Sequence, residues 1–593
     1  MFIGFFSFVT FAQTDLDLAE SYYNNGEFEK ASYYFQKLLD TQPNNSNYIF
    51  RLVEIQQELK QFQAAQTLLE NQYKRRNNPQ FLVELGYNFQ LQNQSQKAIE
   101  FYETALESVS ETPALAYAVA LRFETHSLVD QAIRVYKFAL DHTQNPNYEY
   151  RLAGLYAEKK DIENMFLSYL NFTKNNPTYL NQILRLFGDY ISENASAKYN
   201  LILKKIILQK LQNSSSEFWT KMLSWLYSQQ NDFSKALTLE KAMFRRGGGS
   251  LQGVIDVGLW AKTAKRYKVT SEALKFVVLN AQDFFLKIEA KRQWLVLETE
   301  HLPNPDLGRI QSDYENLLET YGITNETTET LLSYAQFLAF NTDQKNDAVN
   351  RLKSALEANL SSFSSSKIKL KLADILGSQR QFNRALIYYT QVHTALKNST
   401  LAQEARFKAA KTSFYKGDFD WAETQLNVLK SSTSQLIAND ALDLLLLITD
   451  HKFGDSLQSP LTMYAKADFL KFQNKKKEAL SALDALVKTH PTHAIVDQAL
   501  MLQASIFESV NDFEQAEKNY LTIEKTFSDE ILIDDAYFAL AELYRNHLKL
   551  NQKALNYYEK IIFNHQDSIH FVESKKQYRK LRESLEPSST INL

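Results

Sequence analysis

The Gly-rich stretch from Arg245 to Gly253, RRGGGSLQG, is the first segment whose residue types could do chemistry. Three glycines behind Arg245 and Arg246 could present backbone N–H groups to an anion. However, the stretch lacks the Lys-Ser/Thr that closes a phosphate-binding loop, and Gln252 stands where the nucleophile elbow of a hydrolase needs its second glycine. The sequence therefore favours a hinge between two arrays over an anion site. Arg245 and Arg246 stay candidate partner-binding residues.

Two pairs of titratable residues could also have a chemical or structural role. His490 and His493 flank Pro491 in THPTH, where no acidic residue stands beside them to complete a metal site, so a solvated turn is the better interpretation. Asp534 and Asp535 precede AYFALAELY and are expected to cap that helix and complement its dipole. The sequence thus predicts no catalytic residue, no metal ligand and no cofactor.

Adjacent tyrosines form a third group. Tyr22, Tyr389 and Tyr558 are expected to lie in the core, each beside a second tyrosine that points elsewhere. Tyr23 and Tyr388 are such neighbours, and we name both as candidate contacts for a partner peptide. The alternative is that they pack between repeats.

Side chains of this kind need elements to position them, and the chain supplies these elements as a repeat. The phrase NNGEFEKASYYFQKLLD (residues 24–40) returns as YKGDFDWAETQLNVLKS (residues 415–431). Around Ala31, apolar or small residues lie 13, 12 and 9 positions before and 4 and 7 positions after, as on two facing helices. We call the central small residue the anchor. The predicted anchors are Ala31, Ala65, Ala98, Ala132, Met165, Ala236, Ala273 (in a weaker copy), Ala385, Ala422, Ala479, Ala516 and Ala554.

The first five anchors are 34, 33, 34 and 33 residues apart, and this pattern resembles the tetratricopeptide repeat family. The resemblance implies an all-α fold, a right-handed α-solenoid of antiparallel helix pairs. We expect an N-terminal array at 13–178, divergent helical repeats at 179–366, and a C-terminal array with a capping helix at 367–593. The segments LPNPDLG (302–308) and LSSFSSS (360–366) are expected to be loops bordering degenerate pairs.

The N-terminal segment differs from the rest of the chain in its apolar composition. MFIGFFSFVTFAQTD is apolar from Phe2 to Phe11 and offers cleavage after Ala12, so we expect residues 1–12 to be a signal peptide and Gln13 the first mature residue. The alternative is a buried apolar strand or helix start. With no Cys in 593 residues, lipid anchoring through a cysteine is excluded. No later segment approaches 18 apolar residues, so no integral membrane span is expected.

Composition narrows the function classes. A formal charge of −3 demands neither nucleic acid nor an anionic membrane as partner. Only 15 Gly and 10 Pro occur, which favours helices joined by short polar loops. The 32 Tyr and 39 Phe require many aromatic-sized slots in a core.

The C-terminal segments FSDEILIDDAYFALAELY (527–544) and DSIHFVESKKQYRKLR (567–582) resemble exported bacterial tetratricopeptide proteins, including the outer-membrane barrel-assembly and cell-division-coordination groups. The aromatic-rich composition and the leader are similar to exports of the Bacteroidota. These likenesses imply a non-enzymatic periplasmic scaffold that binds partner proteins in its concave groove, with peripheral association to an outer-membrane complex. Two alternatives stay open: a regulatory or catalytic subunit with a site in the divergent middle, and a cytoplasmic adaptor whose leader is not cleaved.

Overall fold

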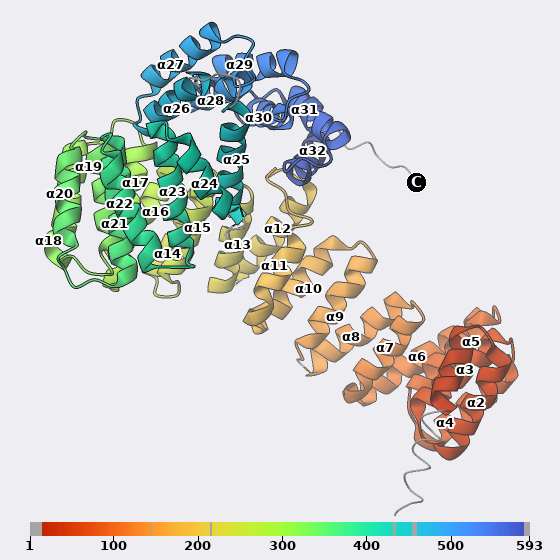
Figure 1. The fold of residues 1–593 in the computed structure, drawn as a ribbon. Coiled ribbons are helices and arrows are strands. Elements are labelled where there is room, and N and C mark those ends of the chain that lie inside the picture. The colour runs from red at the N-terminus through yellow and green to blue at the C-terminus, as the bar shows by residue number, and fades with distance from the viewer. Residues whose placement is uncertain (1–14, 144, 214–215, 431–434, 453–458, 586–593) are drawn as a thin grey trace, which may run out of the picture. The chain divides into compact units, whose positions relative to one another are not determined.

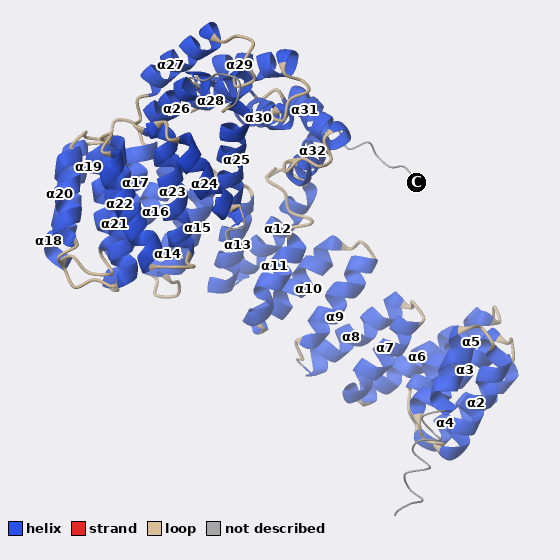
Figure 2. Ribbon diagram, viewed as in Figure 1, coloured by secondary structure: helices blue, strands red, loops and turns tan. Residues whose placement is uncertain are grey.

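The computed structural model describes residues 15–143, 145–213, 216–430, 435–452 and 459–585 (Figure 1). Throughout these ranges the regular elements are helices, and none of the described residues forms a strand (Figure 2). Successive helices pack as antiparallel pairs of the tetratricopeptide type, which confirms the predicted all-α fold class. The expected signal peptide lies outside the described residues, so its cleavage stays a prediction.

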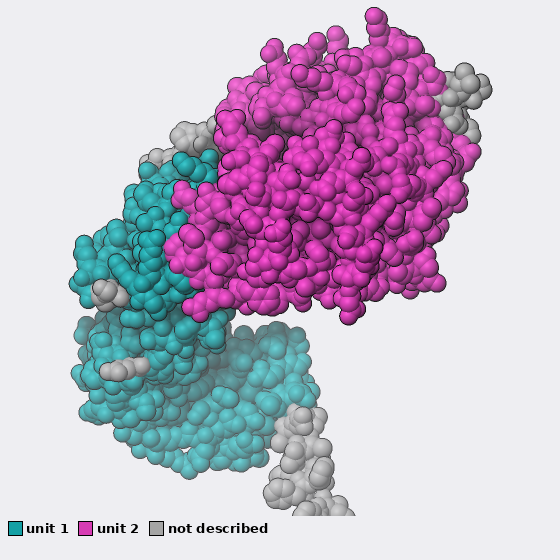
Figure 3. Space-filling model, turned by 90° about the vertical axis from the view of Figure 1, so that its left-hand side faces the viewer, with its two compact units in different colours: residues 1–269 teal, residues 270–593 magenta. Residues whose placement is uncertain are grey.

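The chain divides into two compact units, residues 1–269 and residues 270–593 (Figure 3). Helix α16 (Tyr267–Asn280) crosses the boundary between them. The arrays expected at 13–178 and 367–593 were delimited by the regularity of the sequence, and that division remains a prediction.

Unit 1 begins with a helix over residues 15–24 that pairs with α2 (Phe28–Thr41). Short 3₁₀ turns at Pro113–Leu115 and Pro177–Tyr179 lead into the helices that follow them. The further pairs are α3 (Ser46–Glu58) with α4 (Phe62–Arg76), α5 (Gln80–Leu91) with α6 (Ser95–Glu111), α7 (Ala116–Thr125) with α8 (Val129–Thr143), α9 (Asn147–Glu158) with α10 (Ile162–Asn175), and α13 (Glu217–Gln229) with α14 (Phe233–Arg245). Helices α11 (Leu180–Phe187) and α12 (Lys198–Asn213) both pack against α10, and α15 (Leu251–Thr263) packs against α14.

Unit 2 continues the pairing with one insertion. Helix α25 (Gln435–His451) has no second helix of its own, which explains why the anchors Ala422 and Ala479 are so far apart. The helices of unit 2 are α17 (Phe284–His301) with α18 (Leu307–Tyr321), α19 (Thr328–Phe340) with α20 (Lys345–Ala355), α21 (Ser362–Ser378) with α22 (Phe382–Ala395), α23 (Thr400–Lys416) with α24 (Phe419–Leu429), α25, α26 (Ser459–Phe472) with α27 (Lys476–Thr489), α28 (Val496–Glu508) with α29 (Phe513–Thr526), α30 (Ile533–Leu543, extended by a π-helical turn at Tyr544–Leu548) with α31 (Asn551–Asn564), and the final α32 (Phe571–Leu585).

The predicted anchors form the crossing points of these pairs. Every one of them is buried, with 0 to 2% of its surface exposed. A small side chain at the crossing lets the two backbones approach closely, whereas a large one would force them apart. Met165 is the exception in size, and a flexible thioether side chain suits an irregular gap of this kind.

A residue in the left-handed backbone region lies five positions before each predicted anchor except Ala273. These residues are Gly26, Lys60, Asn93, Ser127, Lys160, Asn231, Arg380, Gly417, Asn474, Asn511 and Lys549. Most of them are not glycine, so the tight turn between paired helices is fixed by packing of the pair rather than by a glycine in the sequence.

The same rule corrects one anchor and supplies another. Lys265 has φ +58°, which places the anchor of the α15–α16 pair at Thr270, 2% exposed, and not at Ala273. The prediction was wrong because it searched for small apolar residues only. Asp343, with φ +56°, likewise identifies Ala348 as the anchor of the α19–α20 pair, which the sequence did not reveal. Within the divergent middle, the turns at Asn231, Lys265 and Asp343 thus keep the backbone of the regular repeats.

Two helical glycines should respond in opposite ways to alanine. A Cβ on Gly86 would lie 2.3 Å from Cε1 of Tyr102, whereas a Cβ on Gly154 would meet no atom within 4 Å. We therefore expect Gly86→Ala to destabilise the protein by about 2 kcal/mol through overpacking. Gly154→Ala should instead stabilise it by up to about 1 kcal/mol, because alanine favours a helix interior. Urea unfolding of both variants tests this: unchanged stability in Gly86→Ala would contradict the packing at Gly86, and a loss in Gly154→Ala would contradict the open space at Gly154.

Candidate partner-binding site

A groove crosses the first helices of the first four pairs of unit 1. It encloses about 580 Å³ and lies at residues 15–24, α3, α5 and the end of α7. Its walls include an aromatic residue, two charged residues and one amide, namely Tyr23, Arg51, Glu58 and Gln57. Stacking helix pairs side by side leaves such a surface because each pair buries only the faces that touch its neighbours.

Tyr23 is held at one end of the groove. The guanidinium of Arg51 lies 4.3 Å from the centre of the Tyr23 ring, and the ring of Phe28 meets Tyr23 edge to face at 5.8 Å. Arg51 also donates from Nη1 to Oε2 of Glu54 at 2.8 Å. A half-buried aromatic ring stacked on an arginine offers a rigid contact surface, and residues of these types commonly carry most of the energy at interfaces.

A buried ion-pair network lies under the groove. Glu84 is fully buried on α5, and its Oε1 accepts from Nε of Arg122 at 2.7 Å and lies 3.0 Å from Nε2 of His126. The Arg122 guanidinium also covers the Phe50 ring at 4.0 Å. The ring of His126 stacks on Tyr87 at 3.7 Å, and burial raises the pKa of the Tyr87 hydroxyl. The network therefore ties α3, α5 and α7 together.

Several polar atoms at this groove have no partner among the described residues. They are Nε2 of Gln57 on the groove wall, and Oε2 of Glu84 and Oδ1 of Asn88 beneath it. Gln57 is 7% exposed and lines the groove itself. A buried polar atom without a hydrogen bond costs about 1–3 kcal/mol, so a ligand or water that supplies a partner is favoured here.

The groove positions share a signal that the sequence contained. Tyr23 and Gln57 stand eight positions before their anchors, Glu54 stands eleven before, and Arg51 and Glu84 stand fourteen before. These positions share one face of each first helix because they are three or six residues apart. Comparing polar residues at equal distances from the anchors would have found the groove.

Comparison with known families agrees with this geometry. Residues 13–45, which span the first helical pair, match the family described as Tetratricopeptide repeat. The first helical pair is a tetratricopeptide repeat. The groove thus starts on a tetratricopeptide repeat and runs over pairs built on the same anchor spacing.

Two solved structures match this chain over most of its length at low identity. One, titled "Structure of Naa15/Naa10 bound to HypK-THB", is 14% identical with a TM-score of 0.27 and covers 91% of this chain and 97% of that chain. Another, titled "Crystal structure of APC/C hetero-tetramer Cut9-Hcn1", is 11% identical with a TM-score of 0.21 and covers 97% of this chain and 96% of that chain. Among curated proteins, no sequence matches this chain significantly.

The predicted partner-binding residues fall in different places. Tyr23 lines the groove, whereas Tyr388 is half-buried on α22 and packs against the core of unit 2. Arg245 and Arg246 are exposed at the end of α14. Neither arginine lines the groove, and a role in binding for each of the four residues stays a prediction.

The Gly-rich stretch is a tight connection between α14 and α15 within unit 1. The N–H groups of Gly247, Gly248 and Gly249 donate to the carbonyls of Phe244 and Met243. These N–H groups are therefore used within the turn, which argues against the anion cradle considered from the sequence. The expected hinge between arrays is also replaced by a turn between consecutive helices.

The two pairs of titratable residues singled out in the sequence, 490/493 and 534/535, also have clear positions in the structure. The rings of His490 and His493 are 6.4 Å apart, and the described residues contain no cluster of three or more His, Cys, Asp or Glu side chains able to hold a metal ion. Asp534 and Asp535 lie in the first turn of α30, but its N-cap is Leu532, and Asp535 instead pairs with His570 at 2.8 Å. The predicted capping role was therefore wrong.

In the part of the chain that the structure describes, no helix is both long and apolar enough to cross a bilayer.

Proposed function

We propose that this chain is a non-enzymatic scaffold that binds extended segments of partner proteins in the groove of unit 1. The groove itself carries this proposal, because it runs over the first helices of successive pairs and has the amide of Gln57 on its wall, where it can form a hydrogen bond with the backbone of a bound segment. Tyr23 and Arg51 supply the rigid aromatic and planar surface beside it. Recognition of this kind needs shape and a few side chains and no reaction.

We also propose that the scaffold works in the periplasm, associated peripherally with an outer-membrane complex. The apolar leader at residues 1–12 and the likeness of the C-terminal repeats to exported proteins support this location. Export predicts that the mature protein starts at Gln13. N-terminal sequencing of the protein purified from its own cells tests this, and an intact Met1 would contradict cleavage.

Site-specific photo-crosslinking tests the groove. A photoreactive phenylalanine at position 23 should give covalent adducts with a discrete partner in cells. The matched control is position 33, where Tyr33 is 67% exposed on the second helix of the same pair and does not line the groove. Equal adducts at both positions, or adducts only at position 33, would contradict binding in the groove.

A further inference from the structure

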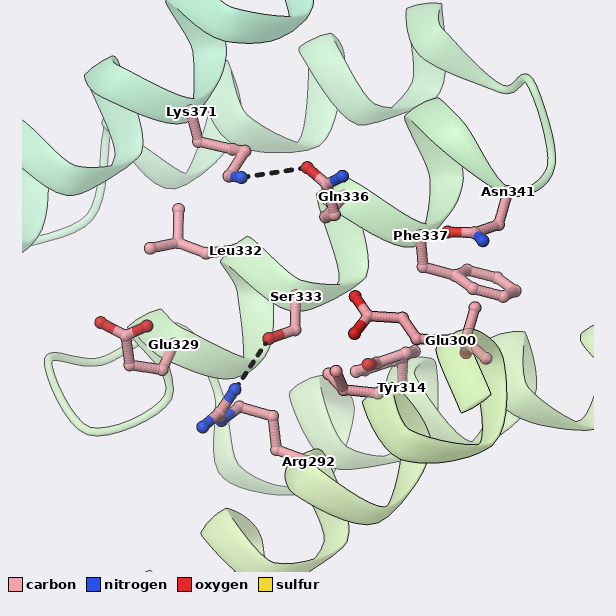
Figure 4. A pocket seen from close by; sticks show the side chains of 12 residues that line it. Arg292, Glu300, Tyr314, Glu329, Leu332, Ser333, Gln336, Phe337, Asn341 and Lys371 are labelled. Atoms are coloured by element: carbon pink, nitrogen blue, oxygen red, sulfur yellow. Dashed lines mark hydrogen bonds between the residues drawn. The ribbon is translucent and has the colours of Figure 1, made fainter. Parts of the chain in front are cut away.

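A second cavity lies wholly within unit 2, on first helices equivalent to those that form the groove of unit 1. It encloses about 260 Å³ between α17, α19 and α21, over the ring of Tyr314 on α18. Lys371 reaches from α21 toward Gln336 on α19, and Arg292 reaches from α17 toward Ser333 on the same helix (Figure 4). Two cationic side chains thus line the cavity from opposite helices.

Lys371 is the anomaly in this cavity. Its ammonium donates to Oε1 of Gln336 at 3.0 Å, and among the described residues no carboxylate lies within ion-pair distance of it. The neighbouring acids are occupied: Asp374 accepts from Tyr389 at 2.7 Å and from Lys408 at 2.9 Å, and Glu329 pairs with Lys367. Lys371 is partly exposed at this cavity, so its ammonium can pair with an acid supplied from outside the chain.

The neighbouring Lys408, by contrast, forms ion pairs with two acidic residues, Asp374 and Glu404. It stands fourteen positions before its anchor, as Lys371 does before Ala385. Asp374 and Glu404 overcome the effect of burial and raise the pKa of Lys408. Burial lowers the pKa of Lys371, and the opposing charges of Asp374, Glu404 and Glu329, none of which forms an ion pair with it, do not offset that effect.

The other charges around the cavity define the anion. Arg292 is already held by Glu289, to which its Nε donates at 2.8 Å, and Glu329 is held by Lys367. Glu300 lines the rim with its side chain 54% exposed. Lys371 is thus a lining cation that has no ion pair among the described residues, whereas the carboxylate of Glu300 at the rim repels a dianion such as phosphate more strongly than a monoanion. A single carboxylate is the anion that this lining favours.

The rest of the lining suits a side chain that carries that carboxylate. Val296, Leu332 and the buried Phe337 offer apolar contacts for methylene groups, and the hydroxyl of Ser333 lies beside them. We infer that the cavity binds an acidic side chain of a partner protein, with Lys371 as its counter-charge. This inference rests on the proposed function in so far as the ligand belongs to a partner protein.

The test uses the full chain and short peptides blocked at both ends, with a central Glu or Gln between two Leu. Titration calorimetry should show the Glu peptide binding at least about 10-fold more tightly than the Gln peptide. Lys371→Met should remove that preference. Lys369→Met, which changes a lysine of the same helix that does not line the cavity, should keep it. The same titration with inorganic phosphate tests whether Lys371 binds a phosphate anion rather than a carboxylate.

Thermal unfolding of the free protein separates a binding role from a structural one. Lys371→Met should raise the unfolding midpoint, because it removes an enclosed charge without leaving an acid unpaired. Lys408→Met should lower the midpoint, because it leaves Asp374 without its lysine. The inference is overturned if Lys371→Met lowers the midpoint, if the Glu and Gln peptides bind alike, or if phosphate binds through Lys371 and the Glu peptide does not. None of these results bears on crosslinking at position 23, so failure here and failure of the proposed function remain distinguishable.

Discussion

Arg122→Met is expected to destabilise the protein by about 3–5 kcal/mol, because it leaves a fully buried carboxylate without its cation. Glu84 has no exposed surface, and Arg122 supplies its charged hydrogen bond at 2.7 Å. After the substitution only His126, at 3.0 Å, faces the same oxygen. Methionine keeps the apolar contact with Phe50, so the loss reports the charge and not the packing. Urea unfolding followed by circular dichroism measures it.

A double variant is the control for this prediction. Glu84→Gln together with Arg122→Met removes both charges, and most of the lost stability should return. If the double variant is as unstable as the single one, the pair does not exist as the structure shows it. If Arg122→Met costs less than about 1 kcal/mol, Glu84 is more accessible to water than its surroundings indicate.

Asp497→Asn is expected to stabilise the protein by about 2 kcal/mol at pH 7. Asp497 is 4% exposed at the start of α28, and burial raises the pKa of its carboxyl to about 6. Because this value lies above that of the unfolded chain, the folded state holds a proton between about pH 4 and pH 6, and stability is lost as the pH rises through that window. The pKa difference corresponds to roughly 3 kcal/mol, which we reduce because solvent screens part of the charge.

The pH dependence makes this prediction specific. Near pH 4 the carboxyl is protonated in the folded state and about half protonated in the unfolded chain, so the aspartate and asparagine proteins should unfold at nearly the same urea concentration. The difference between them should open as the pH increases to 7. A stabilisation that is equal at pH 4 and pH 7 would show that asparagine acts through packing or helix propensity rather than through the buried charge.

The sequence predicted the repeat, because the repeat rests on contacts inside one helix pair. Ala31, Ala385 and Ala516 are buried at their crossings because each must let two helices approach, and that demand leaves a small residue in the sequence. The sequence pattern did not reveal Thr270 as an anchor, because a buried threonine meets the same steric demand with a polar side chain. The sequence did not reveal α25 as an inserted helix, because its apolar run at 441–448 resembles that of any core helix.

The groove was only partly predictable because it depends on contacts between pairs. Tyr23 was named from its place beside Tyr22, which was expected in the core but is only partly buried against it. The network of Glu84 with Arg122 joins residues 38 positions apart on different first helices. Whether such charges meet depends on how neighbouring pairs stack, which the repeat pattern does not specify. The lack of a carboxylate beside Lys371 required the structure for the same reason.

Calorimetric titration of the partner segment recovered by crosslinking at position 23 tests the central claim most directly. The segment, made as a synthetic peptide, should bind the purified full chain, and Gln57→Leu should weaken binding about 10-fold through loss of one hydrogen bond. Tyr33→Ala should leave the affinity unchanged. Unchanged affinity in Gln57→Leu, or an equal loss in Tyr33→Ala, would contradict recognition in the groove of unit 1.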